Sequence, residues 1–300
     1  MPTWATRVPP RKTAIMANTI GKFEVLETLG TGAHSTILHI RRIADSKQYA
    51  LKVVPISGPG DQKFLTQAKH EFRVARMLSH PNLIKIYELE TQSDWLFRIR
   101  KVLLLIEFVN GKTLDKMPRI DVAKLVQIFV KVASAMVHMH RRGVYHADLK
   151  PNNIMLSRTG DVKIIDYGLA WIRGENKGRV QGTPEYMAPE TVKNNFVNER
   201  TDIYNFGATM YRLVTWRNSP TMVSQAGGLP MDAKTFDKLL KPVLECNAEA
   251  PPKLADIIHQ CLAFKAHDRP ERMSEVQGAL DHLADDLVRS PGDKLEAFEW

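Results

Sequence analysis

The chain has 300 residues, 44% hydrophobic and 25% charged, with a formal net charge of +9. These values predict a soluble globular protein with one large domain or two small ones. The basic residues are spread along the sequence without a run of five Lys or Arg. We therefore expect a solvated basic surface and no nucleic-acid partner, although acidic protein substrates or phosphate ligands remain compatible with it.

The cysteines and the apolar segments indicate the compartment. Cys246 and Cys261 match neither a disulfide framework nor a metal-ligand spacing, so we expect buried thiols in a cytoplasmic protein. No segment approaches the ~18–20 uncharged apolar residues of a membrane helix, so no membrane span is predicted. Residues 1–20 lack the apolar core of a signal peptide and are predicted to form a flexible basic tail.

The first hundred residues combine strand patterns with one helical pattern. Their apolar content predicts strands over residues 22–29, 35–40, 48–54, 83–90 and 101–108. Between the third and fourth of these strands, residues 61–78 carry apolar side chains at helical spacing. This part of the chain is therefore predicted to be mostly sheet with one helix.

Beyond Gly111 the apolar spacing becomes helical. The pattern predicts helices over residues 121–140, 201–214, 233–244, 252–264 and 273–289. A strand-rich half followed by a helix-rich half predicts an α+β chain of two lobes.

Glycines follow the first predicted strand at positions 30 and 32. Glycine lets backbone N–H groups approach phosphate oxygens without interference from a side chain. By itself this pattern also fits an ordinary tight turn. A strand rather than a helix follows Ile37, which argues against dinucleotide and P-loop sites, because both place phosphates at a helix N-terminus.

A lysine and a glutamate form the next candidate pair. Lys52 lies inside an apolar strand, and Glu71 follows 19 residues later on the predicted helix. Such a pair can hold an ammonium group against phosphate oxygens. A lone Lys–Glu pair is more often a surface ion pair that contributes less than ~1 kcal/mol.

The most specific segment runs from Tyr145 to Asp166, after the long helix. Phosphoryl transfer needs a base that orients the attacking hydroxyl, a cation near the transferred group, and oxygen ligands for magnesium. Asp148, Lys150 and the pair Asn153 and Asp166 supply these groups in that order. The stretch from Asp148 to Asn153 or Asp166 alone would also fit capping residues at turns. The presence of both, with Asp148 and Asp166 18 residues apart, favours a catalytic site.

With these motifs the sequence resembles the protein-kinase superfamily over residues 21–287. Ala188-Pro189-Glu190 matches it as well, and the segment 182–186 (Gly-Thr-Pro-Glu-Tyr) looks like the serine/threonine branch. The compact form is similar to bacterial Hanks-type kinases. The resemblance implies a bilobal fold with a β-rich N-lobe over residues 21–108, a helical C-lobe over 109–287, and a C-terminal tail over 288–300.

The resemblance also implies ATP and Mg²⁺ as cofactors and protein Ser/Thr hydroxyls as acceptors. Asp148 would be the catalytic base, with Lys150 nearby, while Lys52, held by Glu71, would contact the α- and β-phosphates. The residues implied to surround the nucleotide are Leu29, Gly30, Thr31, Gly32, Ala33, His34, Ser35, Thr36, Ile37, Ala50, Lys52, Glu107, Val109 and Met155. A regulatory partner stays unknown.

Further residues are implied to support this site. Asn153 and Asp166 would be the magnesium ligands. Glu190 would pair with Arg269, and Asp202 would brace the loop that carries the catalytic base. Ile106 would be the gatekeeper beside the adenine.

The sequence departs from the kinase pattern in several places. Ser35 replaces the third loop glycine, for which we expect weaker ATP affinity, and His34 at the loop tip is expected to be exposed. Ala147 replaces the arginine that answers an activating phosphate, and no Ser or Thr lies between Asp166 and Gly182. These two departures together predict activity that does not depend on phosphorylation of this segment.

Three functions remain open from the sequence. The first is a serine/threonine protein kinase. The second is a pseudokinase that binds ATP as a scaffold, which only the altered glycine loop favours. The third is a small-molecule kinase, which would have no need for the peptide platform at 182–190.

Overall fold

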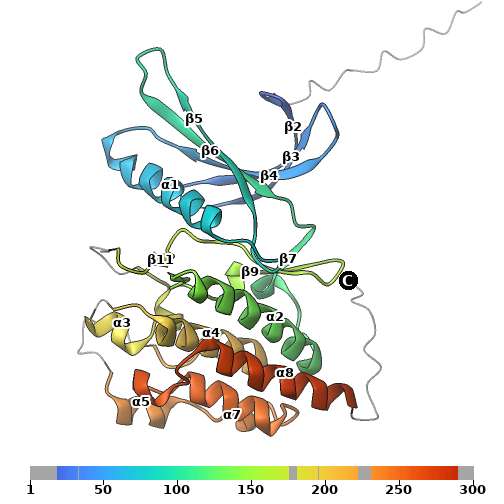
Figure 1. The fold of residues 1–300 in the computed structure, drawn as a ribbon, viewed down its shortest axis with the longest axis vertical. Coiled ribbons are helices and arrows are strands. Elements are labelled where there is room, and N and C mark those ends of the chain that lie inside the picture. The colour runs from blue at the N-terminus through green and yellow to red at the C-terminus, as the bar shows by residue number, and fades with distance from the viewer. Residues whose placement is uncertain (1–18, 33, 176–180, 195, 222–230, 290–300) are drawn as a thin grey trace, which may run out of the picture.

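Apolar side chains alternate along the strands in the first part of the chain, so the sheet that they form has an apolar cluster on each of its two faces. The computed structural model describes residues 19–32, 34–175, 181–194, 196–221 and 231–289, and this part forms two lobes (Figure 1). The N-lobe is a six-stranded antiparallel sheet in the order β1-β2-β3-β4-β6-β5, with one helix against it. Its elements are β1 Thr19–Ile20, β2 Phe23–Thr31, β3 Thr36–Arg42, β4 Gln48–Pro55, α1 Gln62–Met77, β5 Ile86–Ser93 and β6 Ile99–Glu107.

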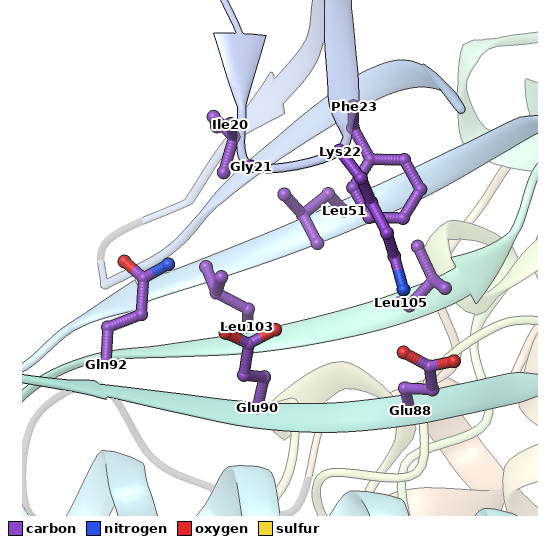
Figure 2. Close-up of a pocket in the computed structure, with 10 residues that line it drawn as sticks. All are labelled: Ile20, Gly21, Lys22, Phe23, Leu51, Glu88, Glu90, Gln92, Leu103 and Leu105. Carbon is purple, nitrogen blue, oxygen red and sulfur yellow. The ribbon is translucent and has the colours of Figure 1, made fainter. Parts of the chain in front are cut away.

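The period of two along β6 assigns its side chains to opposite faces of the sheet. Val102, Leu104 and Ile106 belong to the main core, which includes the buried side chains of α1. Leu103 and Leu105 belong to a second cluster on the opposite face. Leu103 and Leu105 also line a pocket of about 200 Å³ on this second face, together with Phe23 and Leu51. Figure 2 shows these side chains around the pocket.

Helices make up most of the second lobe. They are α2 Val122–Arg141, α3 Pro189–Asn194, α4 Glu199–Thr215, α5 Ala233–Leu239, α6 Val243–Cys246, α7 Pro252–Cys261 and α8 Met273–Arg289. Its short strands are β7 Gly111–Thr113, β8 Val144–Tyr145, β9 Ile154–Ser157, β10 Val162–Ile164 and β11 Trp171–Ile172. Single 3-10 turns occupy Pro59–Asp61, Leu114–Lys116, Pro151–Asn153, Pro184–Tyr186 and Ala266–Asp268.

α2 and α4 form the centre of this lobe. Asp121 caps α2 by accepting from the N–H groups of Ala123 and Lys124, and Asn198 begins α4 with a capping box to Thr201. α2 packs on α8, and α4 packs on α7. α2 has the length and apolar character of a membrane-spanning helix, but 56% of that window is buried in the lobe, as in the core helix of a globular domain.

A line of backbone contacts, here called the lobe seam, joins residues 82–84 to β10. Ile84 N–H donates to the Ile164 carbonyl at 2.9 Å, and Ile164 N–H donates to the Asn82 carbonyl at 2.9 Å. The Asn82 side chain adds a bond to the Val162 carbonyl at 2.8 Å. The seam fixes β10, and therefore the segment that begins at Asp166, to the N-lobe.

The structure agrees with the predicted elements except at several ends. The helix predicted over 233–244 is two helices, because Pro242 has no N–H to continue α5. β5 begins at Ile86 rather than at Leu83, whose only strand contact is an isolated bridge to Ile164. β1 lies within the predicted tail 1–20, of which residues 1–18 are outside the described part of the chain.

The two cysteines differ in burial. Cys261 is fully buried, where its Cβ lies 2.6 Å from the position of a Cβ built on Gly207, so α4 and α7 approach closely at this glycine. Burial raises the pKa of the Cys261 thiol to about 12. Cys246 is half-buried. The prediction of buried thiols is therefore confirmed for Cys261 only.

Candidate active site

A buried carboxylate holds the loop that carries the proposed catalytic base. Asp202, fully buried at the start of α4, accepts hydrogen bonds from the N–H groups of His146 and Ala147, both at 2.8 Å. Ala147 has φ +64°, a left-handed conformation that costs an alanine about 1 kcal/mol. The bracing role expected of Asp202 is present, and its two hydrogen bonds offset the strain at Ala147.

An imidazolium balances the charge of Asp202. His140 Nε2 lies 2.8 Å from the Asp202 carboxylate, and Nδ1 lies 3.1 Å from Glu199. Burial opposes the charged form of His140, but its hydrogen bond with Asp202 and the nearby carboxylate of Glu199 raise its pKa to about 9. His140 is therefore charged at neutral pH. Nothing in the sequence marks His140 for this role, because a histidine within an apolar helical pattern carries no further signal.

The charge on His140 links stability to pH. Its folded pKa of about 9 exceeds the ordinary value of 6.5, so its stabilisation is complete below pH 6.5 and is lost as pH rises through 9. We expect His140→Gln to lower the free energy of unfolding by several kcal/mol at pH 6 and by clearly less near pH 9.5. Urea unfolding of the wild type and the variant across this pH range measures the difference between their free energies of unfolding. A difference that does not change with pH would contradict a charged His140.

Asp148 and Lys150 come together with Thr183 from the segment after β11. Lys150 Nζ donates to Asp148 Oδ2 at 2.6 Å and to Thr183 Oγ1 at 2.5 Å. Thr183 N–H donates to Asp148 Oδ1 at 2.9 Å. Asp148 is buried, with 6% of its surface exposed. Thr183 therefore contacts both Asp148 and Lys150.

Asn153 and Asp166 lie at the same end of the hairpin formed by β9 and β10. Asn153 precedes β9 and Asp166 follows β10, and Ile165 N–H donates to the Asn153 carbonyl at 3.0 Å. The Asn153 amide donates to the Asp148 carbonyl at 2.8 Å, which leaves its oxygen as the group able to face a cation. An amide and a carboxylate oxygen are the hard ligands that Mg²⁺ prefers, so this donor set fits magnesium.

These two ligands do not form a complete metal site. Among the described residues, no cluster of three or more acidic, histidine or cysteine side chains could hold a metal ion. Phosphate oxygens and water would have to supply the remaining ligands. This is the usual situation of Mg²⁺ in phosphoryl-transfer sites.

The ion pair expected between β4 and α1 is formed. Lys52 Nζ lies 2.7 Å from Glu71 Oε2, and only 2% of Glu71 is exposed. Burial opposes the charge on Lys52, but Glu71 and Asp166 raise the pKa of the ammonium above its ordinary value. Lys52 is thus a charged group beside Asp166, with Glu71 fixing its position.

The residues implied for the adenine lie where β4 and β6 meet the C-lobe. Ala50 and Ile106 are register partners across these strands, and both are buried. Met155, in β9, is half-buried. The carboxylate of Glu107 contacts Lys163 Nζ at 2.7 Å and Lys85 N–H at 3.1 Å. Its backbone N–H donates to the Lys85 carbonyl at 2.9 Å, so the group that Glu107 could offer a nucleotide is its backbone carbonyl.

The glycine turn is folded back toward α1. Gly32 N–H donates to the Ser35 carbonyl at 2.8 Å between β2 and β3. His34 is exposed, as expected, but its ring stacks on Phe64 of α1 with centroids 3.9 Å apart. Of the residues implied to cover the nucleotide, Ala33 lies outside the described part of the chain. The His34–Phe64 contact was not predicted, because nothing in the sequence links a loop tip to a helix 30 residues away.

Tyr167 fixes the Asp166 segment beneath α1. Its ring is buried, with 1% exposed, and its hydroxyl donates to the Ile84 carbonyl at 2.9 Å. We expect Tyr167→Phe to lower the free energy of unfolding by ~1–2 kcal/mol, because the buried Ile84 carbonyl loses its donor. Urea unfolding tests this. Tyr87→Phe, at a tyrosine that is 44% exposed, should change stability by less than about 0.5 kcal/mol.

Residues 166–190 are here called the activation segment, and the Glu190–Arg269 pair joins the end of this segment to the C-lobe. Arg269 Nη1 and Nη2 contact the two Glu190 oxygens at 2.9 and 3.0 Å. The same guanidinium donates to the carbonyls of Ala263, Arg200 and Phe264. The ion pair expected from the sequence is therefore present, and Arg269 also donates hydrogen bonds to three backbone carbonyls.

Comparison with known proteins identifies this arrangement. The family model described as protein kinase domain matches residues 23–282. The chain belongs to the protein kinase domain family. The kinase fold is also seen in the autoinhibited serine kinase domain of the giant muscle protein titin, with a TM-score of 0.72, 21% identity and coverage of 88% of this chain and 82% of that chain.

Curated relatives of this kinase domain come from bacteria and plants. A probable serine/threonine-protein kinase of Streptomyces coelicolor is 27% identical over 75% of this chain and 36% of its own length. CBL-interacting protein kinase 1 of rice is 26% identical over 89% of this chain and 56% of its own length. PrkC of Bacillus subtilis is 25% identical over 66% of this chain and 31% of its own length. The kinase domain thus spans about a third to just over half of these relatives.

Proposed function

We propose that this protein transfers the γ-phosphoryl group of ATP, bound with Mg²⁺, to Ser or Thr hydroxyls of protein substrates. The observation that carries the proposal is the contact of Asp148 with both Lys150 and Thr183, beside the Asn153–Asp166 pair. Curated relatives named serine/threonine-protein kinases support the same acceptor.

The chemistry follows from the positions of charged groups rather than from a covalent intermediate. Asn153 and Asp166 would hold Mg²⁺, which neutralises phosphate charge when bound. Lys52 aligns the α- and β-phosphates, because Glu71 fixes its ammonium group. Asp148 accepts the hydrogen bond of the substrate hydroxyl and orients the oxygen for attack. Lys150 is placed to stabilise negative charge on the transferred group.

Side-chain contacts of α1 support activity without a phosphorylated activation segment. His70 Nε2 lies 2.7 Å from the Ala170 carbonyl, and Arg73 lies 2.6 Å from Glu175. These contacts hold α1 against the start of that segment, while the Lys52–Glu71 pair holds α1 against β4. Ala147, in place of the arginine that would receive a phosphate, agrees with this arrangement.

Phosphatase treatment tests this independence. We expect enzyme made free of phosphate, verified by mass spectrometry, to keep its initial rate within about twofold, because the contacts of α1 need no phosphate. The assay must start before the enzyme phosphorylates itself. A rate that recovers only as phosphate appears at Thr183 would contradict the proposal.

The activity itself is tested with matched peptides that differ only in a Ser, Thr, Tyr or Ala acceptor, and with a panel of small metabolites. We expect transfer from Mg-ATP to the Ser and Thr peptides alone. Transfer to a metabolite and to no peptide would favour a small-molecule kinase. Tight Mg-ATP binding without transfer to any acceptor would favour a pseudokinase scaffold.

A further inference from the structure

Large apolar side chains gather at the turn between β5 and β6. The turn and its flanks, residues 93–98, are here called the hairpin tip. Trp95 is 84% exposed, Phe97 is 92% exposed and Leu96 is 44% exposed. Figure 1 shows the β5–β6 hairpin projecting at the end of the N-lobe that lies away from the helical lobe. The tip is therefore remote from the catalytic loop, and its side chains are accessible to a binding partner.

The hairpin tip is a firmly built turn. Asp94 Oδ1 accepts from the N–H groups of Leu96 and Arg98, at 2.9 and 3.0 Å, and Asp94 Oδ2 accepts from Arg100 Nε at 2.8 Å. The Phe97 N–H donates to the Asp94 carbonyl at 3.0 Å. These bonds hold Phe97 at φ +58°, a conformation unfavourable for an aromatic residue. The turn thus orders its apolar side chains without burying them.

The charges next to the hairpin tip are mainly positive. Arg100 pairs with Asp94, whereas Arg98 and Lys101 form no ion pair among the described residues. Lys101 is opposite Gln92 in the β5–β6 register, and the first acidic side chain back along β5, Glu90, lies further from the tip. Two unpaired positive charges therefore flank three exposed apolar side chains, on a chain with a net charge of +9.

The area that the hairpin tip can bury favours a membrane surface over a protein as its partner. Trp and Phe each bury roughly 150–250 Å² at most, so the tip can cover only about 400–500 Å². A stable protein interface needs about 800 Å² on each side. A convex group of Trp, Leu and Phe beside Arg and Lys instead has the composition of segments that enter the headgroup region of a bilayer.

We propose that the hairpin tip inserts Trp95, Leu96 and Phe97 into the surface of membranes that contain anionic lipids, with Arg98 and Lys101 contacting the headgroups. Apolar burial holds the side chains at the interface, and the positive charges select an anionic surface. The kinase domain would thereby be recruited to a membrane as a peripheral protein. This proposal does not depend on the catalytic function.

Vesicle flotation of the full chain tests the proposal. The probes are vesicles of phosphatidylcholine alone and of three parts phosphatidylcholine to one part phosphatidylglycerol. We expect the wild type to float with the mixed vesicles, and the Trp95→Ser/Phe97→Ser variant to bind them at least about tenfold more weakly. Arg98→Gln/Lys101→Gln should weaken binding about fivefold per charge, with little effect on phosphatidylcholine alone.

Two controls separate the hairpin tip from general effects. Ile43→Ser/Val288→Ser removes two other apolar side chains, 63% and 62% exposed, and should bind vesicles like the wild type. Circular dichroism and thermal unfolding establish that each variant folds. Equal vesicle binding by the wild type and Trp95→Ser/Phe97→Ser, or no binding by either, would overturn the proposal. A wild-type dimer that Trp95→Ser/Phe97→Ser converts to a monomer, without vesicle binding, would overturn it in favour of self-association.

Discussion

Replacing Asp148 by Asn will lower the rate of γ-phosphoryl transfer by a factor of about 10²–10⁴, the usual contribution of a positioned general base. Asn has the same shape, and its amide oxygen can still accept from Thr183 N–H, the bond that Asp148 makes at 2.9 Å. It lacks the negative charge that orients the acceptor hydroxyl and pairs with Lys150. The measurement is radiolabelled transfer from Mg-ATP to a Ser peptide, with the melting temperature recorded in parallel.

Asp45→Asn is the matched control for this substitution. It makes the same chemical change at an exposed ion pair with Arg42, where a surface pair contributes less than about 1 kcal/mol. We expect both rate and melting temperature to stay near those of the wild type. If Asp148→Asn kept more than about a tenth of the wild-type rate, Asp148 would not be the base and the proposed mechanism would be wrong.

Arg269→Ala will lower the free energy of unfolding by ~3–5 kcal/mol, the cost of removing one partner from a buried ion pair. Arg269 is 3% exposed, and its loss leaves the Glu190 carboxylate and three carbonyls without this donor. Urea unfolding followed by circular dichroism gives the value. Arg41→Ala, which breaks an exposed pair with Glu24, should cost less than ~1 kcal/mol.

A double substitution separates the ion pair from the carbonyl contacts. Replacing both partners of a buried pair by apolar residues of similar size is often nearly neutral. Here we expect Arg269→Met/Glu190→Leu to remain destabilised, because the carbonyls of Ala263, Arg200 and Phe264 still lose their donor. Recovery of wild-type stability would show that the carbonyl bonds contribute little.

The parts of the site that share a motif could be predicted from the sequence. Asp148, Lys150 and Asn153 lie within six residues of one another, so the local backbone of one loop brings them together. Lys52 and Glu71 could be paired because each lies on a strongly patterned element of its own. For the same reason, strands and long helices were predicted to within a few residues, and two of the departures are at ends set by Pro242 or by the seam.

Other interactions could not be predicted, because they join residues on different elements that no sequence motif links. His140 in α2 meets Asp202 and Glu199 of α4 only because the two helices cross. The stacking of His34 on Phe64 depends on how the glycine turn bends. Trp95 and Phe97 lie between the strands predicted over 83–90 and 101–108, where the sequence gives no pattern that shows whether an aromatic side chain is exposed.

The lobe seam has a consequence for the kinetics of nucleotide exchange. Residues 82–84 and β10 are tied by three hydrogen bonds, and the Glu107 carboxylate adds contacts to Lys163 and Lys85 close by. We therefore expect the lobes to separate by rotation about this line rather than by translation away from each other. Displacement grows with distance from the axis, so the glycine turn would travel furthest, and under the proposed kinase activity ADP would leave beneath it. Breaking the Glu107–Lys163 contact should loosen the axis and speed product release, while the chemical step keeps its rate.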